Sequence, residues 1–149
     1  MKIITKANFT KVTLFATVLL AGCFFAGAAN AQMVQGTFTL DHAARWGKTV
    51  LPAGDYCLRL DPGADPAMAV IFDATSGKRV AVVASGITED GSKGHSALLI
   101  SRRGNQRVIY SFRVAELGES FVYDPALAHG RGIIEANNTE TVPVLDAKK

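Results

Sequence analysis

Apolar and polar side chains alternate along much of the chain after residue 33, which is the spacing of strands with one buried face. In the first such segment, Phe38 and Leu40 are apolar while Thr37 and Thr39 are polar. Because successive side chains of a strand point to opposite faces, this spacing predicts a strand that turns Phe38 and Leu40 toward a core.

A hairpin is predicted next, from residue 49 to residue 60. Residues 49–51 run into Pro52-Ala53-Gly54, where proline presets the backbone of a turn and glycine allows the chain to reverse. The return strand places Tyr56, Leu58 and Leu60 on one face. Cys57 then falls on the opposite face, where partial exposure is expected.

Further strands are predicted wherever short apolar runs stand between polar turns. They cover residues 67–73, 79–85, 97–101, 107–114 and 120–123, with polar loops at 61–66 and 88–94. In the fourth of these runs, one face is expected to carry Val108, Tyr110, Phe112 and Val114. The pattern predicts an all-β protein, a single-domain β-sandwich or small barrel of about seven or eight short antiparallel strands.

The β-domain is predicted to span residues 32–125. Residues 126–149 show no sustained period and are predicted to be weakly ordered, except for an edge strand at 141–145. An edge position would tolerate Pro143, which has no backbone N–H to donate.

The first 31 residues have the pattern of a bacterial signal peptide. Three lysines precede an apolar stretch from Val12 to about Ala29, and Ala29-Asn30-Ala31 gives a small-x-small cleavage pattern. We expect cleavage after Ala31 and export to the periplasm or the extracellular space. In one alternative, Leu20-Ala21-Gly22-Cys23 acts as a lipobox, and a lipid on Cys23 anchors the protein in the envelope. A retained anchor is the third alternative.

Cleavage after Ala31 changes the meaning of the net charge. The formal charge of +3 comes from Lys2, Lys6 and Lys11, so the remaining chain balances 13 basic against 13 acidic residues. Proteins that bind nucleic acid carry a basic excess, so no nucleic-acid partner is predicted. The nearest basic cluster, Arg102, Arg103 and Arg107, surrounds a turn and is typical of a solvated hairpin tip.

Cys57 would be the one cysteine of the cleaved chain, so an internal disulfide cannot form. Its thiol is inert, or it links a homodimer through an intermolecular disulfide, or it acts as a nucleophile. A nucleophilic thiol needs a histidine base, which no neighbouring residue supplies.

Four residues are candidate ligand-binding positions: Trp46, Asp41, His42 and His95. Trp46 is either a core residue or an exposed platform for a sugar or a peptide, and the usual burial of large aromatics favours the core. The spacing of the histidines gives no metal-ligating pair, so no metal or cofactor is predicted. The serines match no nucleophile elbow, and no catalytic residue is assigned.

Two sequence motifs resemble those of a group of small exported bacterial proteins of unassigned function. The first is Trp46-Gly47 followed by Leu51-Pro52-Ala53-Gly54-Asp55-Tyr56, after the threonine-rich segment 36–40. The second is residues 112–118, Phe-Arg-Val-Ala-Glu-Leu-Gly, followed by the aromatic segment 121–123. The resemblance implies a secreted, all-β, single-domain protein and supplies no catalytic residues.

These patterns favour a non-enzymatic exported β-domain that acts in the cell envelope or extracellular space by binding or structural association. The alternative is a small-molecule carrier or hydrolase with a site at the end of the barrel or sandwich. That alternative requires a concave pocket of about 300 Å³ or more with polar groups that converge on it.

Overall fold

The computed structural model describes residues 32–128 and 138–146. The predicted signal peptide, with Cys23, lies outside the described residues, as do residues 129–137 and 147–149. None of the described helices is long and apolar enough to cross a bilayer.

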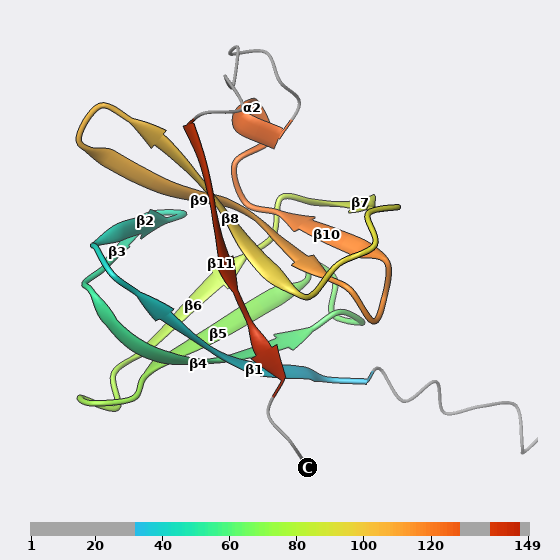
Figure 1. Cartoon of the computed structure of the whole chain (residues 1–149). Helices are drawn as coiled ribbons and strands as arrows, with labels where there is room; N and C mark the ends of the chain where they lie inside the picture. Colours follow the sequence, from blue (N-terminus) through green and yellow to red (C-terminus); the bar gives the residue numbers. More distant parts are fainter. Residues whose placement is uncertain (1–31, 129–137, 147–149) are drawn as a thin grey trace, which may run out of the picture. The chain divides into compact units, whose positions relative to one another are not determined.

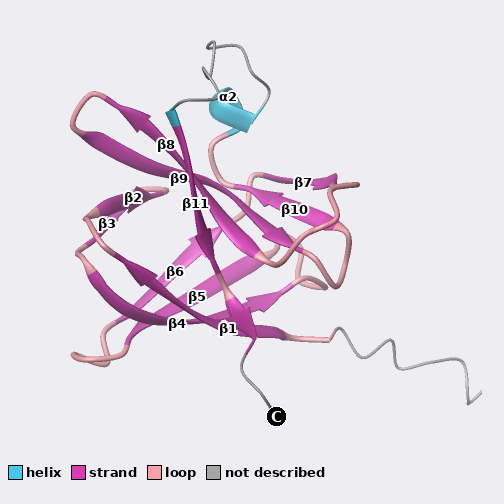
Figure 2. Ribbon diagram, in the orientation of Figure 1, coloured by secondary structure: helices cyan, strands magenta, loops and turns pink. Residues whose placement is uncertain are grey.

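The described residues form two β-sheets, as the alternating pattern predicts (Figures 1 and 2). The order across the five-stranded sheet is β12 (Leu145–Asp146), β1 (Val34–Leu40), β4 (Gly54–Asp61), β5 (Met68–Asp73) and β6 (Arg79–Val83). The order across the seven-stranded sheet is β11 (Thr139–Pro143), β8 (Ala97–Arg103), β9 (Gln106–Val114), β10 (Glu119–Val122) and β7 (Gly86–Glu89). Its other members are β2 (Ala44–Trp46) and β3 (Thr49–Leu51), and a short helix, α2 (Pro125–Ala128), follows β10.

The all-β, sandwich-like prediction is confirmed, and the strands outnumber the seven or eight expected because several are very short. β2 and β3 have three residues each, and β12 has two. Such segments are too short to show an alternating period in the sequence. Pairing is antiparallel except between β2 and β9, which run parallel.

The predicted alternation of β1 and β4 is confirmed. Buried and exposed residues alternate along β1, with Phe38 and Leu40 buried. In β4 the side chains of Tyr56, Leu58 and Leu60 are buried, and Cys57 is exposed. These strands supply much of the core between the sheets.

The predicted hairpin of residues 49–60 is wrong in its pairing. β3 pairs with β2 in the seven-stranded sheet, whereas β4 pairs with β1 and β5 in the five-stranded sheet. Pro52-Ala53-Gly54 therefore carries the chain from one sheet to the other. The Tyr56 hydroxyl donates to the Pro52 carbonyl at 2.8 Å, which holds this corner four residues upstream of the tyrosine. The local hairpin lies earlier, between β2 and β3, where Gly47 has a φ of +59°.

The alternation predicted for residues 108–114 breaks at Tyr110. Leu99 pairs with Ser111 and Ile100 with Ile109, so Tyr110 is an extra residue in β9. A β-bulge of this kind shifts the strand by one residue and exchanges its faces. Ile109 is consequently fully buried, while Tyr110 is half-buried.

Two segments predicted as loop or weakly ordered chain contain strands. Thr88 and Glu89, expected in the polar loop 88–94, belong to β7, which pairs with β10. The C-terminal segment provides β11 on the edge of one sheet and β12 on the edge of the other. The predicted edge strand at 141–145 thus falls on these two strands, with Pro143 at the end of β11.

Candidate functional site

The C-terminal segment crosses from one sheet to the other, and this crossing forms the candidate site (Figure 1). β11 pairs with β8, β12 pairs with β1, and between them the Val144 N–H donates to the Ser96 carbonyl at 2.9 Å. The crossing passes close over Gly36. A Cβ atom on Gly36 would lie 2.5 Å from Val144 Cγ1 and 2.9 Å from the Leu145 carbonyl oxygen, so this close approach requires glycine.

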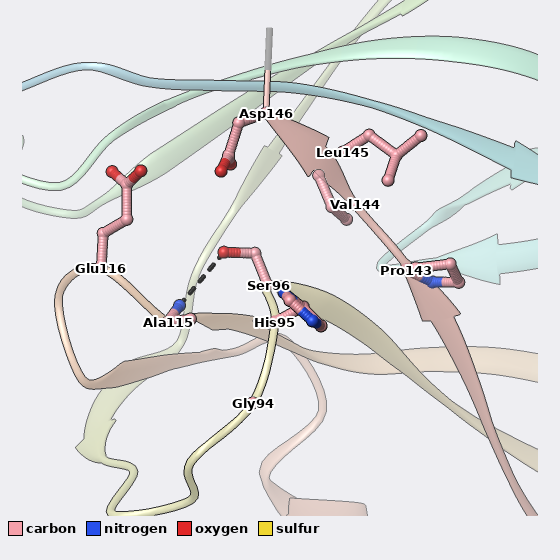
Figure 3. A pocket seen from close by; sticks show the side chains of 9 residues that line it. All are labelled: Gly94, His95, Ser96, Ala115, Glu116, Pro143, Val144, Leu145 and Asp146. Carbon is pink, nitrogen blue, oxygen red and sulfur yellow. Dashed lines mark hydrogen bonds between the residues drawn. The ribbon is translucent and has the colours of Figure 1, made fainter. Parts of the chain in front are cut away.

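One side of the crossing is a groove of about 520 Å³, which we call the histidine groove. It is lined by Gly94, His95, Ser96, Ala115, Glu116, Pro143, Val144, Leu145 and Asp146. Figure 3 shows how three separate segments contribute to it: the loop before β8, the turn after β9, and the C-terminal crossing. Pro143, Val144 and Leu145 supply an apolar strip along this groove.

Three titratable side chains line the histidine groove: His95, Glu116 and Asp146. All three are exposed, and neither carboxylate makes an ion pair with another described residue. Ser96 is buried, and its Oγ accepts a hydrogen bond from the Ala115 N–H at 3.1 Å. That bond joins two walls of the groove.

A polar cluster holds the loop that carries His95. Asp90 accepts hydrogen bonds from the Ser92 N–H at Oδ1 and from the Ser120 hydroxyl at Oδ2, both at 2.9 Å. Arg113 donates from Nη1 to Ser92 Oγ at 3.1 Å. The hydrogen bond with the Ser92 side chain is the largest of the effects that lower the pKa of Asp90, and partial burial opposes them. The ionised carboxylate thus fastens residues 90–92 to the outward face of the seven-stranded sheet.

The other side of the crossing is a groove of about 420 Å³, which we call the cysteine groove. It lies between β1, β4 and the crossing, and its polar lining includes Asp41, Asp55 and Cys57. The Thr39 hydroxyl donates to Asp55 Oδ1 at 2.7 Å, so this carboxylate is anchored to the neighbouring strand. Pro143 and Leu145 line both grooves and form the ridge that separates them.

The four candidate ligand-binding residues do not come together. His95 lines the histidine groove and Asp41 lines the cysteine groove. His42 is exposed and lines neither of these grooves. Trp46 has no exposed surface, so the stacking-platform interpretation is wrong and the core interpretation holds.

Trp46 instead joins the two sheets. It belongs to β2, which pairs with β9, and its ring makes edge contacts with Phe38 of β1 and with Tyr123. The centroid distances are 6.1 Å and 5.1 Å, respectively. Burial raises the pKa of the Tyr123 hydroxyl. Neither that hydroxyl nor Trp46 Nε1 has a hydrogen-bond partner among the described residues.

Sequence analysis missed Glu116 and Asp146 as groove residues. Glu116 lies in the turn after β9, and Asp146 lies at the end of the described chain. The edge strand expected at 141–145 was the one signal that could have pointed to Asp146, because a strand on a sheet edge places the residues that follow it beside that sheet. Nothing local to Glu116 showed that this strand would pass beside it.

No group of three or more histidine, cysteine or acidic side chains in residues 32–128 and 138–146 is placed to hold a metal ion. Comparison with family models, with characterised proteins and with solved structures finds no match for this chain.

Proposed function

We propose that this protein is an exported, non-enzymatic binding domain whose ligand occupies the histidine groove. The observation that carries the proposal is the groove itself, with about 520 Å³ of space beside an apolar strip and three polar side chains. Ligand sites combine these features: a concave space above about 300 Å³, an apolar lining and a few polar groups that orient the ligand.

The lining of the histidine groove favours a ligand with both apolar and cationic parts. Val144 and Leu145 offer apolar contact, while Glu116 and Asp146 offer carboxylates without an ion-pair partner among the described residues. A short peptide with a basic side chain between apolar ones fits this chemistry. Charge-assisted hydrogen bonds to the carboxylates would select its cation.

The place of action in this proposal rests on the N-terminal sequence. A leader cleaved after Ala31 would release the domain into the periplasm or extracellular space, and a lipid on Cys23 would tether it in the envelope. The resemblance to small exported proteins of unassigned function agrees with either outcome. The intact mass of the protein released by cells separates them, because a chain starting at Gln32 carries no lipid.

The alternative function, a small-molecule carrier or hydrolase, would use the same groove. Ser96 is its buried hydroxyl, and the hydrogen bond described for its Oγ comes from the Ala115 N–H rather than from a histidine. A nucleophilic serine needs a base within hydrogen-bond reach. The binding-domain proposal therefore has the stronger support from the lining.

Peptide titration tests the proposed ligand class. The protein, expressed from its full sequence, is titrated by NMR with acetyl-Leu-Lys-Leu-amide and with acetyl-Leu-Glu-Leu-amide. We expect the lysine peptide to bind and to shift the amide signals of residues 94–96 and 143–146. The double variant Glu116→Gln/Asp146→Asn should weaken its Kd by about tenfold, which corresponds to about 1.4 kcal/mol.

Glu119→Gln is the matched control. Glu119 lies in β10, three residues from Glu116, and does not line the groove. Its substitution should leave the Kd unchanged. Equal binding of the two peptides, or equal weakening by the control, would show that the two carboxylates do not select the ligand.

A further inference from the structure

We propose that the free edge of β6 is the interface of a homodimer, in which the β6 strands of two copies pair side by side and antiparallel about a two-fold axis at Ala81. β6 lies at one end of the five-stranded sheet, and β12 lies at the other. The histidine groove is lined by β12, so this pairing leaves the groove of each copy open and does not depend on the proposed function.

The hydrogen bonds at the two ends of β6 show which of its backbone groups are bonded to β5. The Asp73 N–H donates to the Lys78 carbonyl, and the Ala84 N–H donates to the Ala67 carbonyl, both at 2.9 Å. Between antiparallel strands, hydrogen-bonded positions recur at every second residue. In the register of β5 and β6, the even-numbered residues of β6 therefore bond to β5, and the backbone groups of the odd-numbered residues point away from the sheet.

The odd-numbered residues of β6 are Arg79, Ala81 and Val83. All three are exposed, Val83 by 51%. Their N–H and C=O groups have no backbone partner among the described residues. Such a row of unpaired donors and acceptors is a template for a further strand.

β6 also lacks the features that usually block an exposed strand edge, such as a short length, a proline, a bulge or a charge. Of the other edge strands, β12 has two residues, β3 has three, β11 ends at Pro143 and β7 ends at Glu89. β6 has five residues, no proline and no register shift against β5. Its one charged group, the Arg79 guanidinium, lies over the Phe72 ring of β5 at 5.3 Å, on the side away from the free edge.

The free row is symmetric about Ala81, and this symmetry favours a second copy of β6 as the occupant. A two-fold axis between two Ala81 residues sets each Arg79 opposite Val83 of the other copy, so every free N–H and C=O of the row gains a partner. Isologous interfaces require such self-complementarity. The residue that meets its own copy at the axis has a small, uncharged side chain, and no two arginines face each other.

The side chains between the free residues support the same pairing. The two-fold axis sets Val80 opposite Val82 at non-hydrogen-bonded positions, where facing side chains are closest. Val82 is buried, whereas Val80 is only partly buried against the core, so a facing valine would cover it. Pairs of β-branched residues across strands stabilise a sheet. A flexible peptide would lose conformational entropy on pairing here, whereas β6 of a second copy is already extended.

The size of the edge predicts weak association. Five residues at about 3.4 Å each give an interface about 17 Å long and one strand wide. That is smaller than the ~800 Å² per partner of a stable complex, so the dimer should form only at high protein concentration. Because pairing uses the β6 edge of both copies, assembly should stop at the dimer.

Hydrogen exchange measured by NMR over a range of protein concentrations tests the edge. In the protein expressed from its full sequence, the amides of Arg79, Ala81 and Val83 should gain protection as sedimentation velocity shows the dimer forming. The amides of Val80 and Val82 should be protected at every concentration. A protein that stays monomeric, or one that forms species larger than a dimer, would overturn the proposal. Protection of the odd-numbered amides that does not depend on concentration would also overturn it, because a segment of the same chain would then cover the edge.

Charges placed on the axis test the second copy. Ala81→Lys should weaken dimerisation by about fivefold, because like charges directly opposite each other destabilise paired strands. An equimolar mixture of Ala81→Lys and Ala81→Glu should form a heterodimer that is tighter than either homodimer. Gln106→Lys, at the exposed tip of the β8–β9 hairpin, is the matched control and should leave dimerisation unchanged. Circular dichroism of each variant separates a lost interface from a lost fold. A mixture that does not recover association would contradict the two-fold axis.

Cysteine cross-linking tests the register, with Cys57→Ser as the background. At a hydrogen-bonded pair the two Cα atoms are about 5.5 Å apart, within the range of a disulfide, so Ala81→Cys should cross-link to its own copy. Oxidised glutathione takes up the electrons of the two thiols and leaves as two molecules of reduced glutathione. Val83→Cys alone should not cross-link, because its copies would be about 14 Å apart, whereas a mixture of Val83→Cys and Arg79→Cys should. Equal cross-linking of Ala81→Cys and Val83→Cys would mean that the strands meet only by random collision.

Discussion

Two of the connections between the two sheets differ in how tightly they pack. At one, which we call the packed seam, the β2–β3 hairpin inserts Trp46 and leaves a cavity of only about 30 Å³ beside β3. At the other, the open seam, the C-terminal crossing leaves grooves of about 520 Å³ and 420 Å³ on its two sides.

The side chains available at each seam explain the difference. The packed seam is filled by aromatic rings, with Trp46 against Phe38 and Tyr123, and Phe38 stacked on Tyr56 at 5.3 Å. The open seam is spanned by one segment of small and medium residues, in which β11 makes five pairs with one sheet and β12 makes two pairs with the other. One seam therefore contributes mainly to stability, and the other offers space for a ligand.

The largest expected effect on stability is that of Trp46→Ala, which removes the side chain that fills the packed seam. Removing a fully buried indole loses its apolar contacts and leaves a cavity, at a cost of about 3–5 kcal/mol of the free energy of unfolding. Chemical denaturation measures this cost. Val50→Ala, in the same hairpin but 61% exposed, is the control and should change stability by less than about 0.5 kcal/mol. Similar losses in both variants would mean that the indole does not hold the sheets together.

A smaller substitution, Gly36→Ala, should disrupt the packing of the open seam. The added methyl group would overlap Val144 and the Leu145 carbonyl oxygen, so the crossing must move, at a cost of about 1–3 kcal/mol. We expect faster hydrogen exchange at the Val144 amide and weaker peptide binding in the histidine groove. Gly86→Ala, where nothing lies within 4 Å of the added Cβ, is the matched control. An unchanged Val144 amide in Gly36→Ala would contradict this account of the crossing.

Local patterns in the sequence predicted most of the residues that face the core, but not the partner of the strand that follows Pro52. Leu58 and Leu60 were expected on the buried face of a strand, and they are. The pairing of that strand with β1, rather than with the segment before Pro52, depends on contacts between distant residues. The bulge at Tyr110 could not be predicted either. The apolar and polar residues of β9 alternate through position 110, and the sequence does not show that β8 has no residue paired with Tyr110.

The candidate site was harder to predict than the fold because its residues converge only through tertiary structure. His95, Glu116 and Asp146 are separated by 20 or more positions and meet at one groove because the C-terminal strand joins both sheets. Trp46 illustrates the opposite case. A lone tryptophan beside a glycine suits a binding platform or a core residue equally well by pattern, and only its position between the sheets decides.

A third, smaller effect should distinguish two tyrosines at the packed seam. Tyr123→Phe removes a buried hydroxyl that has no partner among the described residues, so stability should rise by up to about 1 kcal/mol. Tyr56→Phe removes a hydroxyl that donates to Pro52, so stability should fall by about 1 kcal/mol. Parallel denaturation curves measure both. A loss in Tyr123→Phe would reveal a partner for its hydroxyl, such as a bound water.

The smallest expected effect is a loosening of the open seam at acidic pH. Hydrogen bonding keeps the pKa of Asp90 below its ordinary value of about 3.9, so its stabilising contribution is complete above that value. The contribution is lost as the pH falls through the lower pKa of the folded state. Protonation weakens the hydrogen bonds from Ser92 and Ser120, and the loop that carries His95 should then separate from Arg113.

Hydrogen exchange at the Ser92 amide, measured at pH 3 and at pH 6, tests this loosening. After correction for the intrinsic pH dependence of exchange, protection at Ser92 should fall at pH 3, while amides of β4 keep theirs. Asp90→Asn should show the low protection at both pH values, and Glu89→Gln, one residue away on the exposed strand β7, should behave like the original protein. Equal protection of Ser92 at both pH values would mean that the Asp90 carboxylate does not hold this wall of the histidine groove, and the loop would then owe its position to its other hydrogen bonds, such as those of Ser96 with Ala115 and Val144.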